Sequence, residues 1–206
     1  MMELFLAAFI TLFVVIDPPG TAPIFSSLTQ GASGAQRRSM AIRAVVIAAI
    51  ILFGFALAGE AFLHTLGISL EAFRIAGGIM LFFIAMDMVF ETRTKRREDR
   101  AQKVMETPEI EDVAVFPMAM PMIAGPGSIA TIMLLMARAG GPQETAIVMA
   151  ALIANLLLML AGLLAVGPIM RLFGTQVEAV TTRLLGVILA ALAVQFVLDG
   201  LSESIL

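Results

Sequence analysis

The chain consists mainly of long apolar stretches separated by short clusters of charged residues. Asp17 is the one ionisable side chain in these stretches, which cover residues 4–36, 44–59, 75–86, 113–137, 145–170 and 184–198. A helix needs about 20 mainly apolar residues to cross a bilayer. If each stretch extends a few residues into its flanks, the pattern predicts an all-α membrane protein with six transmembrane helices.

Composition strengthens this prediction and excludes several kinds of site. Hydrophobic residues make up 60% of the chain and charged residues 14%, whereas soluble domains carry about 25% charged residues. There is too little polar surface to coat a water-soluble globule. The chain has no Cys and one His, His64, which excludes thiolate ligands and a multi-histidine centre within one subunit. We expect no metal site, no cofactor and no nucleic-acid partner.

The charged loops predict how the helices are oriented. Most of the 13 Lys and Arg residues follow the first, third and fifth apolar stretches, whereas Arg74 and Arg138 lie on the opposite side. Basic loops stay in the cytoplasm, so both termini are expected outside a bacterial inner membrane. Residues 91–112 form a charged cytoplasmic loop. We interpret it as a tether, and a partner-binding role is left open.

Self-comparison indicates an internal repeat. Residues 16–21 align with 123–128 at an offset of 107, and the same offset takes Gly67 to Gly174. After a two-residue slip, further matches pair Arg74 with Arg183 and Gly77 with Gly186. Each copy holds three predicted spans, an odd number, so the second copy must enter the membrane from the opposite side. The sequence therefore predicts a 3+3 inverted repeat, with residues 1–90 and 113–206 as its halves.

Proline and glycine interrupt the first and fourth predicted spans. The interrupting residues are Asp17-Pro18-Pro19-Gly20 and Pro23 in one, and Pro117, Pro121 and Gly125-Pro126-Gly127 in the other. Proline lacks an N–H and clashes with the preceding turn, and glycine allows backbone angles closed to other residues. Irregular backbone at membrane depth is found where it is buried in protein or lines a wet cavity. We therefore predict discontinuous first and fourth helices that meet at a midplane site.

The residues at each break suggest a division of roles. Asp17 stands at an N-cap position with Pro18 first in the helix, and Gly125 and Pro126 repeat this arrangement. A helix N-terminus binds anions, so the one that runs from Gly125 to Ser128 is expected to hold a substrate carboxylate. Asp17 would face a cation, which could be a substrate ammonium group, a coupling proton or Na⁺. The alternative is that Asp17 only caps its own helix.

The fifth predicted span contributes one further polar residue, Asn155, where the matching position of the first half is Ala48. It is expected to line the pathway or to form an interhelical hydrogen bond. The complete set of candidate substrate- or ion-binding residues is Asp17, Pro18, Gly20, Thr21, Pro23, Gly125, Pro126, Gly127, Ser128 and Asn155.

These motifs resemble those of the MarC family of bacterial inner-membrane proteins. The resemblance rests on Asp17-Pro18-x-Gly20-x-x-Pro23, on Pro117 to Pro121 leading into Gly125-Pro126-Gly127, and on a length near 200 residues. It covers essentially the whole chain, and Pro19 adds a doubled proline. The family is similar to transporters of small neutral amino acids and, more distantly, to the lysine-exporter superfamily. The resemblance thus implies a permease for substrates such as glycine and alanine.

The leading prediction is a secondary transporter of small neutral amino acids, coupled to H⁺ or Na⁺. Alternatives are an exporter of another small metabolite or drug, and a membrane scaffold that does not transport. An intramembrane enzyme is disfavoured, because the spans lack converging acid, base and nucleophile groups. Substrate identity, direction, coupling ion and assembly into a homo-oligomer are left open by the sequence.

Overall fold

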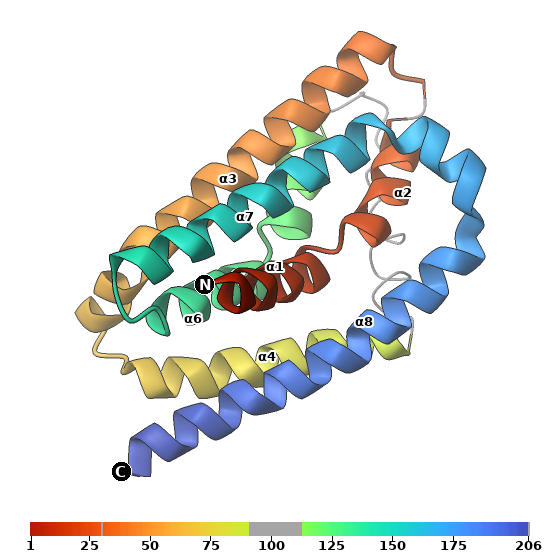
Figure 1. The fold of residues 1–206 in the computed structure, drawn as a ribbon. Coiled ribbons are helices and arrows are strands. Elements are labelled where there is room, and N and C mark those ends of the chain that lie inside the picture. Colours follow the sequence, from red (N-terminus) through yellow and green to blue (C-terminus); the bar gives the residue numbers. More distant parts are fainter. Residues whose placement is uncertain (30, 91–112, 206) are drawn as a thin grey trace.

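The computed structural model describes residues 1–29, 31–90 and 113–205, and the helices dominate all three ranges (Figure 1). The predicted charged loop, 91–112, lies outside these residues. The elements in chain order are α1 (Met2–Ile16), α2 (Pro18–Leu28), α3 (Gly34–Thr65), α4 (Leu70–Val89), η1 (Ala114–Ile123), α6 (Pro126–Ala137), α7 (Pro142–Leu164) and α8 (Val166–Ile205). No strand occurs in the described part of the chain.

Five helical stretches are long and apolar enough to cross a membrane. They are Met2–Leu28, Gly34–Thr65, Leu70–Val89, Pro142–Leu164 and Thr182–Ser204. η1 and α6 make a sixth if they are counted together, although they are bent by 51° at their junction. The prediction of an all-helical membrane protein is confirmed, with five to six candidate spans. The inverted repeat and the discontinuous spans stay predictions at this stage.

Local sequence explains where the long helices begin. The Ser33 hydroxyl accepts a hydrogen bond from the Gln36 N–H, and the Gln36 side chain accepts one from the Ser33 N–H, which together form a capping box for α3. Ser69 caps α4 in a simpler way, by accepting from the Ala72 N–H at 3.2 Å. α7 begins with Pro142, whose missing N–H costs nothing in the first turn.

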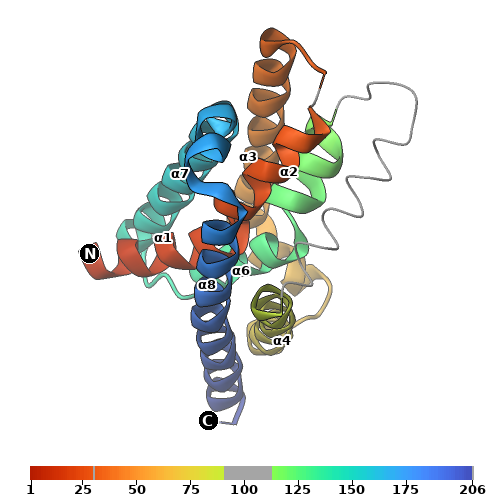
Figure 2. The same cartoon turned by 90° about the vertical axis from the view of Figure 1, so that its right-hand side faces the viewer.

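The longer helices form two outer groups, and shorter helices lie between them. α3 and α7 run alongside each other on one side, and α4 packs along the C-terminal half of α8 on the other (Figures 1 and 2). The shorter helices α1 and α6 lie between these groups and contact helices of both. The C-terminal end of α1 and the first turn of α6, which the sequence singled out, therefore lie between the two outer groups.

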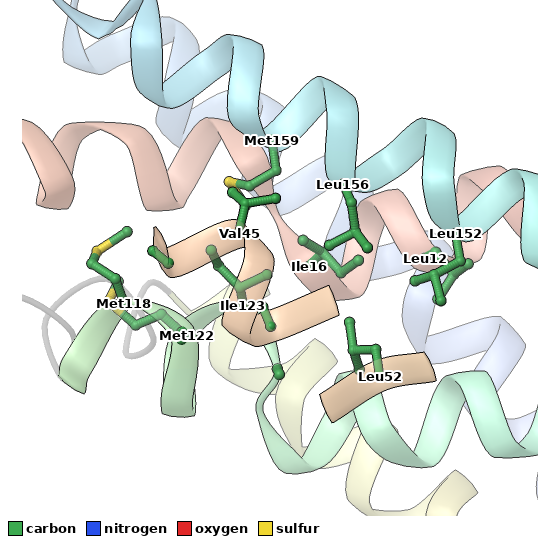
Figure 3. Close-up of a cluster of buried hydrophobic side chains, with 14 of the residues drawn as sticks. Leu12, Ile16, Val45, Leu52, Met118, Met122, Ile123, Leu152, Leu156 and Met159 are labelled. Carbon is green, nitrogen blue, oxygen red and sulfur yellow. The ribbon is translucent and has the colours of Figure 1, made fainter. Parts of the chain in front are cut away.

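Two clusters of buried side chains hold this arrangement together. The larger cluster joins α1, α3, η1 and α7 through residues such as Leu12, Leu52, Ile123 and Leu156 (Figure 3). The smaller one joins α1, α4, α6 and α8. Many large apolar side chains point outward instead, among them Ile50, Phe83, Leu157 and Leu184, each more than 60% exposed. Such a surface suits lipid as the solvent.

Glycine allows the close approach of α4 and α8. A Cβ on Gly78 would lie 2.8 Å from the carbonyl oxygen of Ala193, and one on Gly200 would lie 3.0 Å from that of Glu71. Small residues at such contacts let helix backbones pack closely in membranes, where burial from water does not drive association.

Candidate functional site

The first candidate position is the junction between α1 and α2. Asp17 has φ 57° and ψ 64°, and it is the one non-glycine residue with positive φ in the described chain. Its N–H still donates to the Phe13 carbonyl at 2.9 Å, which closes α1. Pro18 follows, and it has no N–H with which to extend α1. The chain therefore turns here and starts a second helix.

The Asp17 side chain caps α2 inside the protein. Its carboxylate accepts a hydrogen bond from the Gly20 N–H at 3.2 Å, although Asp17 is only 2% exposed. A Cβ on Gly20 would overlap this carboxylate, with 3.0 Å to Cγ. Gly20 is therefore required by the close approach of Asp17. The predicted N-cap position of Asp17 is confirmed, and its binding of a cation stays a prediction.

Two neighbouring residues complete the description of this junction. Thr21 is buried, and its hydroxyl lies 3.4 Å from the Ile16 carbonyl oxygen, at the long limit of a hydrogen bond. Pro23 was expected to contribute to the interruption, but it lies inside α2, which continues to Leu28. The break is confined to Asp17 and Pro18, because the missing N–H of Pro23 removes only one internal hydrogen bond of α2.

The second candidate position is the junction between η1 and α6. η1 is irregular, because Phe116 and Met120 have extended backbone angles within it. Each precedes a proline, Pro117 or Pro121, and a residue before proline is pushed out of the helical region. A Cβ on Gly125 would overlap the carbonyl oxygen of Pro121. The backbone thus turns sharply at Gly125, and α6 starts at Pro126, in agreement with the predicted cap.

The first turn of α6 is largely buried. Gly127 and Ser128 are buried, with Ser128 2% exposed, whereas Pro126 is exposed. A Cβ on Gly127 would lie 3.3 Å from Val15 Cγ1 and would overlap Ile84 Cδ1. Val15 lies two residues before Asp17, in the last turn of α1. The structure therefore brings the end of α1 next to the N-terminus of α6, so the two junctions are neighbours inside the bundle.

Asn155 lies elsewhere in the same interior. It is fully buried on α7, and its side-chain nitrogen donates to the carbonyls of Phe9, at 3.1 Å, and Ala151, at 3.0 Å. The first of these bonds crosses from α7 to α1, so the predicted interhelical hydrogen bond is present. The bond to α1 is made about two turns before Asp17.

A group of charged residues ties three helices together at one end of the bundle. Arg74 of α4 is 5% exposed, forms an ion pair with Glu203 of α8 and lies 3.4 Å from the Ala137 carbonyl at the end of α6. Arg138 follows α6 and pairs with Asp199 of α8. Burial lowers the pKa of the Arg138 guanidinium, and the Asp199 carboxylate opposes that change. These partners were not predicted from the sequence.

Thr131, one turn beyond Ser128, is a second residue that sequence reasoning missed. It is fully buried, and its hydroxyl has no hydrogen-bond partner among the described residues. Its place in the turn after Ser128 was the only available signal. Within the described residues, no three His, Cys, Asp or Glu side chains come together as metal ligands would.

Known proteins are similar in sequence to this chain over nearly its whole length. A sequence profile for "MarC family integral membrane protein" matches residues 2–205. The chain is 37% identical over 205 residues to a UPF0056 membrane protein of Archaeoglobus fulgidus, covering 99% of this chain and 95% of that one. It is 35% identical over 193 residues to the UPF0056 membrane protein YvbG of Bacillus subtilis, covering 94% and 92%. No solved structure matches the chain significantly.

Proposed function

The chain belongs to the MarC family of integral membrane proteins, and on that basis we propose that it is a secondary transporter of small neutral amino acids. The observation that carries the proposal is the proximity of two helix junctions inside an apolar bundle, seen where Val15 meets Gly127. Interrupted helices at corresponding positions of two repeats are typical of substrate sites in secondary transporters.

The element contacts support an inverted repeat of three spans each. Exchanging the halves turns α1, α2, α3 and α4 into η1, α6, α7 and α8. Under this exchange, the contact of α1 with α7 corresponds to the contact of η1 with α3. In the same way, the contacts of α2 with α7 and with α8 correspond to those of α6 with α3 and with α4. All six contacts occur in the structure. The α3–α7 and α4–α8 pairs are their own counterparts. A two-fold relation of this kind gives the protein near-equivalent inward-open and outward-open states.

The two junctions differ in charge, and we assign them different ligands. The first N–H groups of α6 have no partners within the helix and carry a partial positive charge, so they suit a carboxylate. Asp17 brings a carboxylate to the other junction, where it suits an ammonium group, H⁺ or Na⁺. An ionisable residue inside a membrane protein is a candidate functional residue by default, which favours a role of Asp17 beyond capping.

The residues around the second junction favour a small substrate. Gly125, Gly127 and Ser128 have little or no side chain, and Val15 and Ile84 already pack against Gly127. Glycine, alanine and serine are the amino acids that suit so small a site. We place the protein in the cytoplasmic membrane with both termini outside, because most of its basic residues lie in loops on one side.

Counterflow in proteoliposomes tests the proposal. Vesicles loaded with unlabelled glycine or alanine should accumulate the labelled amino acid, and vesicles without protein should not. Leucine is the size control and should exchange far more slowly. Repeating the assay with pH and Na⁺ varied independently identifies the coupling ion. If the vesicles exchange another small metabolite or a drug but none of these amino acids, the proposed substrate class is wrong. If they exchange no solute at all, the result favours a membrane scaffold that does not transport.

A further inference from the structure

An ion pair joins the two predicted halves of the protein at the end of the bundle where α6 ends. Arg74 belongs to the first half, and its guanidinium pairs with the Glu203 carboxylate of the second half. The same guanidinium lies 3.4 Å from the carbonyl oxygen of Ala137, the last residue of α6. One side chain of the first half therefore contacts two helices of the second half.

α4 and α8 pack closely beside this ion pair (Figure 1). Arg74 is 5% exposed, and a Cβ on Gly200 would lie 3.2 Å from the Arg74 Cβ. About one turn further into the bundle, a Cβ on Gly78 would lie 2.8 Å from the carbonyl oxygen of Ala193, which is fully buried. The Arg74 guanidinium is thus enclosed by helices of both halves.

The equivalent residue of the other half has a different environment. The internal alignment pairs Arg74 with Arg183 and Gly77 with Gly186. A Cβ on Gly186 would lie 3.1 Å from the Ala85 carbonyl oxygen, so Arg183 lies toward the opposite end of the α4–α8 pair. Arg183 is exposed, whereas Arg74 is buried. Two residues that the repeat makes equivalent therefore differ, and the guanidinium is enclosed at one end of the pair only.

Such a difference is expected if one end of the bundle is closed by a contact that the other end lacks. Alternating access in transporters with inverted repeats is largely a rocking of one repeat against the other. A side chain that contacts both repeats at one end must release one of them when that end opens. Arg74 meets this condition, because Glu203 and Ala137 both belong to the opposite half.

The energetics of the ion pair also favour a contact that can be released. The Glu203 side chain is 51% exposed, and Nε of Arg74 is buried with no hydrogen-bond partner among the described residues. An unpaired buried donor costs free energy. A buried ion pair also adds little stability compared with apolar residues of the same volume. Stability of the fold is therefore a weak reason for an ion pair at this place.

We propose that the Arg74–Glu203 ion pair is a gate, which holds the two halves together at the end of the bundle expected outside and breaks when that end opens. Arg138 and Asp199 form the neighbouring ion pair, but both belong to the second half, so rocking of the halves does not separate them. The inference rests on the proposed transport function for its place in a transport cycle. The opening itself can be measured without any substrate.

Two cysteine reporters measure how open each end is, because the chain has no Cys of its own. Ala193→Cys reports on the Arg74 end and Ala85→Cys on the opposite end, and both alanines are fully buried. Labelling rates with a charged thiol reagent are measured in lipid nanodiscs, which leave both membrane faces open to the reagent. Each reporter is combined with Arg74→Gln. The matched control is Arg138→Gln, which breaks an ion pair within one half.

The gate predicts a change at one end only. Arg74→Gln should raise the labelling rate of Ala193→Cys at least about fivefold, the population shift expected for a lost ion pair that is partly exposed. The rate of Ala85→Cys should stay level or fall. Glu203→Gln should have the same effect, because it breaks the same pair, and it serves alone if Arg74→Gln does not fold. Arg138→Gln should leave both rates at their wild-type values.

Other outcomes overturn the inference. A similar rise at both reporters means that Arg74 only stabilises the packing of the bundle, and unchanged rates mean that its ion pair does not hold this end closed. An equal rise with Arg138→Gln shows that joining the two halves is not what matters. If the reporters respond as expected and counterflow detects no exchange of any solute, the proposed function is wrong and the gate stands. Counterflow without the reporter response refutes the gate alone.

Discussion

At the scale of single residues, Asp17 combines two properties that can be separated. Asp17 has a positive φ, and its side chain accepts a hydrogen bond from the Gly20 N–H. Asn meets these two requirements nearly as well as Asp, because either residue tolerates the left-handed region and either side chain accepts a hydrogen bond from an N–H. The negative charge is not needed for either. An amide at the same place therefore tests whether the Asp17 carboxylate has a role beyond capping.

We predict that Asp17→Asn inserts and unfolds like wild type but loses at least about tenfold in transport rate, the effect of removing a charged partner. Asp17→Leu is the structural contrast, and it should lose about 2–3 kcal/mol of stability from the left-handed backbone and the missing cap. Transport is measured by counterflow over a range of pH. An Asp17→Asn protein with the wild-type rate at every pH would limit Asp17 to capping.

A substitution at Gly20 tests the position of the Asp17 carboxylate without changing Asp17 itself. In Gly20→Ala the new methyl group overlaps the Asp17 carboxylate and displaces it, so transport should fall toward the level of Asp17→Asn. Gly54→Ala on α3 is the control, because a Cβ there meets no atom within 4 Å and alanine favours a helix. The counterflow rates of the two variants are compared. Equal rates would show that the position of the Asp17 carboxylate does not matter.

Residue-scale features were the most predictable part of the protein. Asp17, Pro18, Gly125 and Pro126 mark helix boundaries because they act on the nearest turns of the chain, and sequence neighbours determine that effect. Pro23 shows the limit, since it remains inside α2. The reason for Gly20 was also hidden, because it depends on where the Asp17 side chain points and not on the backbone angles of glycine.

At the scale of elements, the sequence predicted which residues form helices better than it predicted which helices pack against each other. The spans are apolar on all sides, so no polar face indicates which side of a helix packs inward. The contacts of Gly127 with Val15 and of Asn155 with Phe9 join segments more than a hundred residues apart, and periodicity carries no information about such pairs. Periodicity also gives no information about the ion pairs that join α8 to α4 and to the end of α6.

These ion pairs give a prediction about stability. The Arg74 side chain is 6% exposed and its partner Glu203 is 51% exposed, whereas Arg138 and Asp199 are each about a third exposed. Removing one member of a buried pair is costly, and exposure of Glu203 reduces that cost, so Arg74→Gln should lose about 1–3 kcal/mol. Arg138→Gln should change stability by about 1 kcal/mol or less. Unfolding temperatures in detergent measure both, and the reverse order would contradict the burial argument.

At the scale of the whole molecule, the basic loops predict that both termini face outward, and the absence of Cys makes this directly testable. Ser204, near the C-terminus, and Ala35, at the start of α3, are both exposed. We predict that Ser204→Cys reacts with a membrane-impermeant thiol reagent in intact cells. Ala35→Cys should react only after the membrane is permeabilised. The opposite pattern would invert the orientation, and reaction of both in intact cells would contradict the predicted number of spans between them.

The central claim is that the α6 N-terminus faces a solute chamber that opens to both sides of the membrane. Ser128 lies in that first turn and is 2% exposed, so a reagent can reach it only when the bundle opens. The most direct measurement is the labelling rate of Ser128→Cys by a charged, membrane-impermeant thiol reagent added from either side of oriented vesicles. The claim predicts reaction from both sides, slowed by glycine or alanine. Labelling only by apolar, membrane-soluble reagents, with no protection by amino acids, would contradict it.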